Sequence, residues 1–251
     1  MEHWYYYLLL VAVGILVGII NTMSGGGSLL TLPVLIFVGL PSNIANGTNR
    51  IAVLIQTFFN IAGYKSKGAI GKSPFPFYLS ISATVGAVIG AKLAIDIRGE
   101  LFNKILAIVM ITVVGFMVFR PKQNFNELAD RITGKYLKYS IIVFFFIGIY
   151  GGFIQAGAGL FILLALSSIN HLTLIKSNVI KVLVIFTYSI VALFMFGINL
   201  KLDWGAGLTL ASGQAVGGWF TSRWSINKGD GIVKIFLIIM VMGMAIKLWF
   251  F

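Results

Sequence analysis

Residues 21–30 read NTMSGGGSLL, and this run interrupts a hydrophobic stretch that is long enough to enter a lipid bilayer. Residues 155–162 read QAGAGLFI and interrupt a hydrophobic stretch in the second half of the chain in the same way. Irregular backbone at membrane depth is tolerated only where protein or a water-filled cavity covers it. Two such breaks at corresponding positions of two halves are the sequence pattern that best indicates a binding site between them.

The composition places the chain in a membrane. Its 251 residues are 59% hydrophobic and only 10% charged, with a mean hydropathy of +0.97. A soluble domain would carry roughly 25% charged residues. Apolar runs recur along most of the chain, which predicts a polytopic all-α membrane protein. The first run begins at Trp4 with no basic segment before it, so we expect no cleavable signal peptide.

Cysteine content and charge exclude several classes of protein. The chain has no cysteine, which excludes disulfides, thiol catalysis and thiolate metal sites. Its net charge of +12 is interpreted as Lys and Arg in loops that face the cytoplasm. Nucleic-acid binding would need a basic patch on a soluble domain, and the sequence has no such domain.

Ten apolar segments are expected to form helices. A full crossing needs about 20 residues, whereas Leu29–Val38 and Leu160–Ile169 are much shorter and each follows a glycine cluster. The polar stretch Arg120–Lys138 divides the chain into an N-terminal transmembrane repeat at residues 1–119, a cytoplasmic linker at 120–138 and a C-terminal transmembrane repeat at 139–251. The other expected segments are Tyr5–Ile20, Ile44–Gly63, Pro76–Ala94, Leu101–Phe119, Tyr139–Ile154, Val179–Gly197, Trp204–Thr221 and Ile232–Phe251.

The two halves resemble each other at a nearly constant offset, which indicates an internal repeat. Gly25 and Gly27 match Gly157 and Gly159, and Thr48-Asn49 matches Ser177-Asn178. Glycine pairs four residues apart also match, and we interpret them as close helix crossings. These pairs are Gly14/Gly18 with Gly148/Gly152 and Gly86/Gly90 with Gly213/Gly217.

Loop charges favour two inverted repeats, each with a glycine-broken re-entrant helix and about three transmembrane helices. The loops at 64–75, 120–138, 170–181 and 223–234 are basic, whereas those at 95–104 and 198–204 are balanced. If each broken element turns back, all four basic loops face the cytoplasm. If each broken element crosses once, the repeats are parallel and the basic loops of the second half face outward, an alternative that stays open.

The glycine breaks are expected to bind an anion. A half-helix begins directly after each break, so its free N–H groups and positive dipole end point at the break. That arrangement suits a negatively charged ligand. Glycine also lets a ligand approach the backbone closely. Three adjacent glycines end a helix better than they pack one.

Polar residues near the start of two long apolar segments form a second candidate group. Asn49 and Arg50 lie in one, and Asn178 and Lys181 lie in the other. A cation inside an apolar helix is costly unless it faces a cavity or a partner. An anionic substrate, or the dipole ends at the break, could be that partner. The alternative that these residues cap their helices stays open.

The position of the acids limits the chemistry. None of the seven Asp and Glu residues lies in the middle of an apolar segment. A carboxylate proton relay and a carboxylate metal site are therefore not expected. No nucleophile–base arrangement is present, so we expect neither an enzyme nor a cofactor. The candidate substrate-binding residues are Ser24, Gly25, Gly26, Gly27, Asn49, Arg50, Gln155, Gly157, Gly159, Asn178 and Lys181.

Nearly the whole chain resembles the TauE/SafE sulfite exporter family, also called the TSUP transporters. The resemblance is carried by the glycine run at 24–28 with Pro33, by 45–50, which read ANGTNR, and by a degenerate second copy at 151–160 with Ala158 in the middle of its glycines. It implies a multi-pass inner-membrane transporter of small sulfur-containing anions, such as sulfite, sulfoacetate and other organosulfonates. An anion channel, a carboxylate transporter, a non-transporting scaffold and a homo-oligomer stay open.

Overall fold

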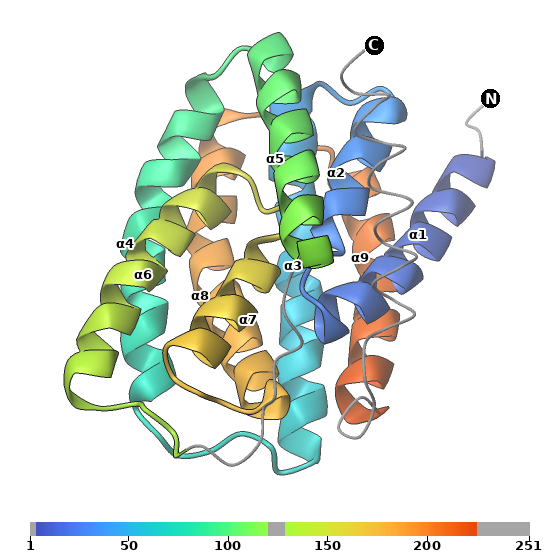
Figure 1. Ribbon diagram of the computed structural model, residues 1–251. Helices are drawn as coiled ribbons and strands as arrows, with labels where there is room; N and C mark the ends of the chain where they lie inside the picture. The colour runs from blue at the N-terminus through green and yellow to red at the C-terminus, as the bar shows by residue number, and fades with distance from the viewer. Residues whose placement is uncertain (1–3, 120–128, 225–251) are drawn as a thin grey trace.

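The computed structural model describes residues 4–119 and 129–224, and these ranges form α-helices with no strand (Figure 1). Helices satisfy their own backbone hydrogen bonds, which is required in lipid. The helices are α1 (Trp4–Met23), α2 (Ser28–Phe37), α3 (Ser42–Ser66), α4 (Phe75–Asp96), α5 (Gly99–Phe119), α6 (Gly134–Phe153), α7 (Ala158–Ser168), α8 (Leu174–Asn199) and α9 (Trp204–Trp224).

The all-α class is confirmed, and so are the two short helices after the glycine clusters. Four helices, namely α1, α4, α6 and α8, have both the length and the hydropathy to cross a membrane. The expected segment Ile232–Phe251 lies outside the described residues. The polar linker is shorter than predicted, because α6 begins at Gly134, where the polar first turn continues into the apolar helix.

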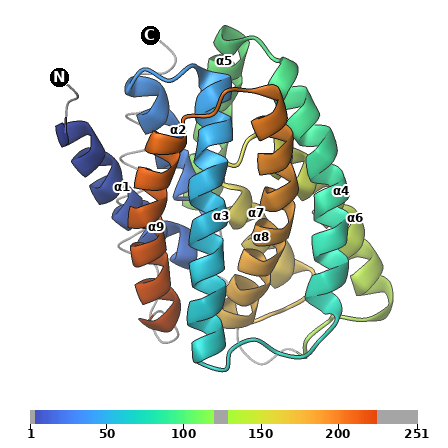
Figure 2. The same cartoon turned by 180° about the vertical axis from the view of Figure 1, so that it is seen from behind.

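The helices on either side of each glycine cluster reverse direction. In Figure 1, α1 descends from the end of the bundle where the chain begins, and α2 returns toward that end. The pair α6 and α7 does the same from the opposite end. Figure 2 shows α3 and α8 side by side and running in opposite directions between the two pairs.

Glycine pairs make the closest helix crossings, as predicted. A Cβ atom on Gly18 of α1 would lie 2.6 Å from the carbonyl oxygen of Gln214 on α9. A Cβ atom on Gly90 of α4 would lie 1.9 Å from the carbonyl oxygen of Ile149 on α6. These two crossings join α1 of the first half to α9 of the second, and α6 of the second half to α4 of the first. The two halves are therefore interlocked.

One end of the bundle carries most of the described positive charge. The α3–α4 connection, the start of α6, the start of α8 and the end of α9 lie at that end (Figure 1). The basic residues of these segments are Lys65, Lys67, Lys72, Arg131, Lys135, Lys138, Lys176 and Arg223. At the other end, the α4–α5 and α8–α9 connections and the first turns that follow them hold Asp96, Arg98, Glu100, Lys104, Lys201 and Asp203, which balance in charge.

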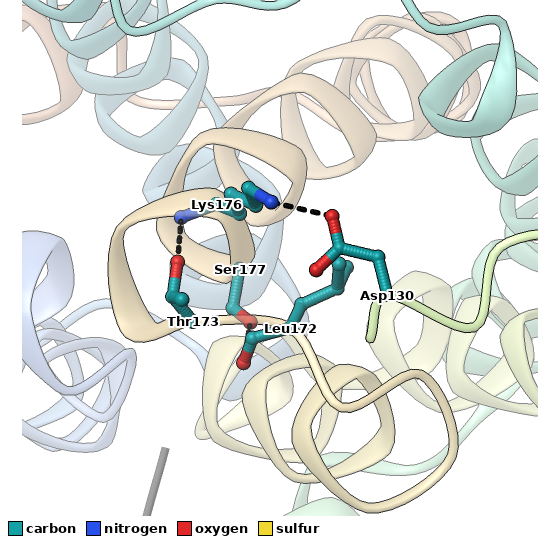
Figure 3. A network of polar contacts seen from close by, with 5 residues as sticks. All are labelled: Asp130, Leu172, Thr173, Lys176 and Ser177. Atoms are coloured by element: carbon teal, nitrogen blue, oxygen red, sulfur yellow. Dashed lines mark hydrogen bonds and ion pairs between the residues drawn. The ribbon is translucent and has the colours of Figure 1, made fainter. Parts of the chain in front are cut away.

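Helix α8 begins earlier than the sequence indicated (Figure 3). Thr173 is its N-cap, and the Thr173 hydroxyl oxygen accepts a hydrogen bond from the Lys176 N–H group at 3.4 Å. The ammonium of Lys176 pairs with Asp130 at the surface. The interpretation of Asn178 as a helix cap is therefore wrong. Lys181 also belongs to no loop, because it lies two turns inside α8 and is only 1% exposed.

Candidate functional site

The two glycine breaks contact each other in the centre of the bundle. A Cβ atom on Gly25 would lie 2.4 Å from the carbonyl carbon of Gly159, and one on Gly159 would lie 2.8 Å from the Cα atom of Gly25. Gly25 and Gly157 have φ angles of +76° and +75°, in the left-handed region that glycine adopts without strain. The breaks therefore need glycine both for the turn of the chain and for the contact between their backbones.

Both half-helices begin without a side-chain N-cap. Gly27 precedes α2 and Gly157 precedes α7, and neither position supplies a capping side chain. The Ser28 N–H group donates to the Asn21 side-chain oxygen at 3.2 Å. The N–H groups of Gly26 and Gly27 have no acceptor in the described part of the chain. A helix start of this kind is positive and attracts anions.

A small cavity lies where the two breaks meet. Its volume is about 20 Å³, enough for a water molecule. Residues of both breaks line it, together with side chains from α3 and α8. The lining residues are Asn21, Gly25, Ser28, Val53, Gln56, Thr57, Asn60, Gln155, Gly159, Lys181, Val182 and Ile185. Polar groups from four separate segments thus converge on one small space inside an apolar bundle.

Lys181 is the charged residue in the described lining of this cavity. Its ammonium donates to the carbonyl oxygens of Asn21 at 2.8 Å and Thr22 at 3.0 Å, which are the last carbonyls of α1. It also donates to the Asn178 side-chain oxygen at 2.6 Å. The negative end of a helix dipole stabilises a cation. These contacts tie α8 of the second half to the break of the first half.

Arg50 makes the reciprocal connection from α3. Its Nη1 and Nη2 atoms donate to the carbonyl oxygens of Gly151 at 2.6 Å and Gly152 at 2.7 Å, at the end of α6. Nη1 also donates to the Gln155 side-chain oxygen at 3.1 Å. The guanidinium lies 5.3 Å from the centre of the Phe196 ring, which adds a cation–π contact. Arg50 therefore ties the first half to the break of the second half.

Neighbouring amides complete this network. Asn46 donates to the carbonyl oxygen of Phe153 at 2.8 Å, beside the contacts of Arg50. Gln56 accepts from the Asn21 amide at 3.0 Å and donates to the Gly18 carbonyl oxygen at 3.2 Å. Side chains of α3 and α8 therefore pair carbonyl groups near the ends of α1 and α6, as buried polar groups require.

We expect Arg50→Lys to lower the free energy of unfolding by about 1.5–3 kcal/mol, because one ammonium cannot reproduce both contacts of the guanidinium and a hydrogen bond to a charged group contributes about that much. Denaturant titration of the protein in detergent measures the change. Arg98→Lys is the matched control, because Arg98 is exposed and such surface changes stay within about 0.5 kcal/mol. Equal losses for the two variants would show that the carbonyl contacts of Arg50 contribute nothing.

Four of the predicted site residues line the cavity, namely Gly25, Gln155, Gly159 and Lys181. The others lie behind it. The Ser24 hydroxyl donates to the Ile20 carbonyl oxygen, and Asn178 accepts from Lys181. Asn49 is buried and its amide has no partner among the described residues. The remaining predicted residues, Gly26, Gly27, Arg50 and Gly157, hold the breaks without lining the space.

The sequence prediction missed five polar residues of the lining, namely Asn21, Ser28, Gln56, Thr57 and Asn60, and three apolar ones. Asn21 and Ser28 flank the glycine run, and Gln56 lies six positions after Arg50 in the same apolar segment. Residues spaced three or four apart share one face of a helix. On α3, Gln56 and Asn60 are four positions apart, and Asn49 lies two helical turns before Gln56. This pattern of polar residues on one helix face could have indicated the face that meets the cavity.

The chain matches known proteins over almost its whole length. It is 26% identical to the probable membrane transporter protein ORF9 of Sinorhizobium sp. over 240 residues, covering 95% of this chain and 90% of that protein. It is 25% identical to a probable membrane transporter protein of Haemophilus influenzae, covering 96% and 93%. It is 26% identical to the probable membrane transporter protein YfcA of Escherichia coli K12, covering 94% and 87%. No solved structure matches it.

The family comparison agrees with the resemblance noted in the sequence. Residues 10–248 match the family described as sulfite exporter TauE/SafE. The match covers most of α1, all of α2 to α9 and both glycine breaks. The relatives are named as membrane transporters and not as enzymes. The chain is therefore a multi-pass membrane transporter that belongs to the sulfite exporter TauE/SafE family.

Proposed function

We propose that this protein is a secondary transporter that carries small sulfur-containing anions, such as sulfite, sulfoacetate and other organosulfonates, across the inner membrane by alternating access. The observation that carries the proposal is the cavity between the breaks, where the first residue of α2, Ser28, meets Gly159 of α7 and the ammonium of Lys181. A cation and two helix starts favour an anion. The family name supports sulfite or a related solute.

An inverted repeat is supported by the way in which the contacts of one half recur in the other. Helix α1 packs on α9 as α6 packs on α4, and α3 packs on α9 as α8 packs on α4. Arg50 binds the end of α6 as Lys181 binds the end of α1. The opposite directions of α3 and α8 support the inversion (Figure 2). Two such repeats can exchange conformations and so open a central site alternately to each side.

The size of the cavity supports a transporter over an open anion channel. A space of about 20 Å³ holds a water molecule but no sulfonate, so a substrate enters only after the bundle opens. An open channel would instead need a continuous path for the ion. The basic end of the bundle is the cytoplasmic end in this proposal, because positively charged loops favour that side.

Transport by purified protein in liposomes tests the proposal. We expect uptake of labelled sulfite to saturate with concentration and to be faster when the liposomes contain unlabelled sulfite, because a carrier exchanges solutes through one site. Liposomes without protein are the control. Acetate at the same concentration tests the alternative of a carboxylate substrate. Current that does not saturate would favour a channel, and exchange of acetate without sulfite would overturn the sulfur-containing substrate.

A further inference from the structure

The cavity is lined by one charged group and several neutral ones. Lys181 supplies the positive charge, and Asn21, Gln56, Asn60 and Gln155 supply carboxamides. No described residue of the lining is acidic. The cavity can therefore offset a negative charge of a ligand, but nothing in the described lining offsets a positive one.

The carboxamides around the cavity are already engaged. Asn21 Oδ1 accepts from the Ser28 N–H group, and Gln56 Oε1 accepts from the Asn21 amide. Gln155 Oε1 accepts from Arg50. The Asn60 amide donates to the Thr22 hydroxyl oxygen at 3.1 Å, and that hydroxyl donates to the Gly18 carbonyl oxygen at 2.7 Å. An ammonium group that entered this space would find acceptors that the protein already uses for its own contacts.

The described acidic residues lie at or near the ends of helices and not among the residues that line the cavity. Asp96 ends α4, Glu100 lies in the first turn of α5, Asp130 precedes α6 and Asp203 precedes α9. Two of them form ion pairs with lysines, Glu100 with Lys104 and Asp130 with Lys176. None of these four carboxylates is part of the cavity wall.

We propose that the cavity distinguishes ligands by the charge of the group opposite the sulfonate, and that it accepts sulfonates without an amino group while rejecting amino sulfonates such as taurine. This inference rests on the proposed function and narrows its substrate class. The sulfonate binds near the ammonium of Lys181. In an amino sulfonate the second charged group is a cation, which the Lys181 ammonium repels. That cation would also lose its hydration on entering the cavity, and no carboxylate in the described lining would compensate for the loss.

The test compares two molecules of nearly the same size. Isethionate and taurine share a two-carbon sulfonate, and differ in a hydroxyl group in place of an ammonium. Each is added to liposomes that exchange labelled sulfite. We expect isethionate to compete at a concentration at least about tenfold lower than taurine. Methanesulfonate, which is smaller than both and has no amino group, tests whether a size limit rather than a charge limit governs competition.

A single substitution in the lining should reverse this order. Asn60→Asp places a carboxylate in the cavity with almost no change of shape. We expect the variant to lose competition by isethionate at least about tenfold and to gain competition by taurine. Gln56→Glu is the second variant, and the melting temperature of each protein in detergent shows that it has folded.

The results separate this inference from the proposed function. If sulfite is not exchanged at all, the proposed function fails. If sulfite is exchanged and taurine competes as well as isethionate, the inference fails while the function stands. The inference also fails if sulfite is exchanged and neither methanesulfonate nor isethionate competes, because the site would then take no organic sulfonate.

Discussion

Gly25→Ala is expected to lower the free energy of unfolding by about 2–5 kcal/mol. The added Cβ atom would lie 2.4–2.8 Å from main-chain atoms of Gly159 and Leu160, which cannot move away as a side chain could. Overpacking of this kind costs about 1–3 kcal/mol. The φ angle of +76° adds about 1–2 kcal/mol for a residue with a Cβ atom. Denaturant titration in detergent measures the sum.

Gly68→Ala is the matched control for this prediction. Gly68 has a φ angle of +66°, but a Cβ atom on it would meet nothing within 4 Å. Its substitution therefore carries the cost of backbone conformation, about 1–2 kcal/mol, without the collision. The difference between the two variants isolates the contact between the breaks. Equal destabilisation would mean that the breaks can separate freely and that their contact is not needed for the fold.

Lys181→Met is expected to weaken anion binding by about 2–5 kcal/mol, or more than about 30-fold, and to abolish exchange of sulfite at concentrations that saturate the unchanged protein. Methionine keeps the length of the side chain but removes the charge that lines the cavity. The measurement is the rise in melting temperature with added sulfite, together with counterflow in liposomes.

Lys176→Met controls for the loss of a lysine from the same helix. Lys176 lies five positions earlier on α8, and its ammonium pairs with Asp130 at the surface (Figure 3). Exposed ion pairs contribute at most about 1 kcal/mol to stability, so this variant should keep both its fold and its sulfite exchange. If Lys181→Met exchanged sulfite as fast as the unchanged protein, Lys181 would not be part of the binding site. Its role would then be limited to the hydrogen bonds that connect α8 to α1.

The glycine breaks and the half-length helices could be predicted from the sequence because their signals are local. Clustered glycines such as Gly25–Gly27 disfavour a continuous helix, and the short apolar runs after the two glycine clusters leave room for only a half-helix. The helix crossings at the glycine pairs could also be predicted, because close helix crossings in membranes need small residues. These local patterns define most of the helix boundaries to within a few residues.

The partners of the buried cations could not be predicted in the same way. Arg50 contacts carbonyls 101 and 102 positions away, and Lys181 contacts carbonyls 159 and 160 positions away. Main-chain carbonyls leave no mark in a sequence, since every residue has one. The sequence indicated that each cation needed a partner inside the bundle, but it could not decide between a substrate and the end of a broken helix.

The start of α8 was misplaced for a related reason. Ser177 and Asn178 are residues that often cap helices, and they precede the strongest apolar run, so they looked like its beginning. The helix starts at Leu174, where a polar turn continues into the apolar run, and Thr173 is the cap. Propensity alone cannot distinguish two neighbouring candidates when tertiary contacts hold the extra turn.

The crossing of α1 with α9 has a consequence for biogenesis. The ribosome adds about 5–20 residues per second, so roughly 10–40 s separate the synthesis of Gly18 from that of its packing neighbours around Gly217. During that interval α1 lacks its packing partner α9, and for most of it the first break also lacks the ammonium of Lys181. Helix α9, which is made late, completes the packing of α1, which is made first. Until α9 is inserted, lipid, water or the insertion machinery must shield the exposed polar backbone of the nascent first half.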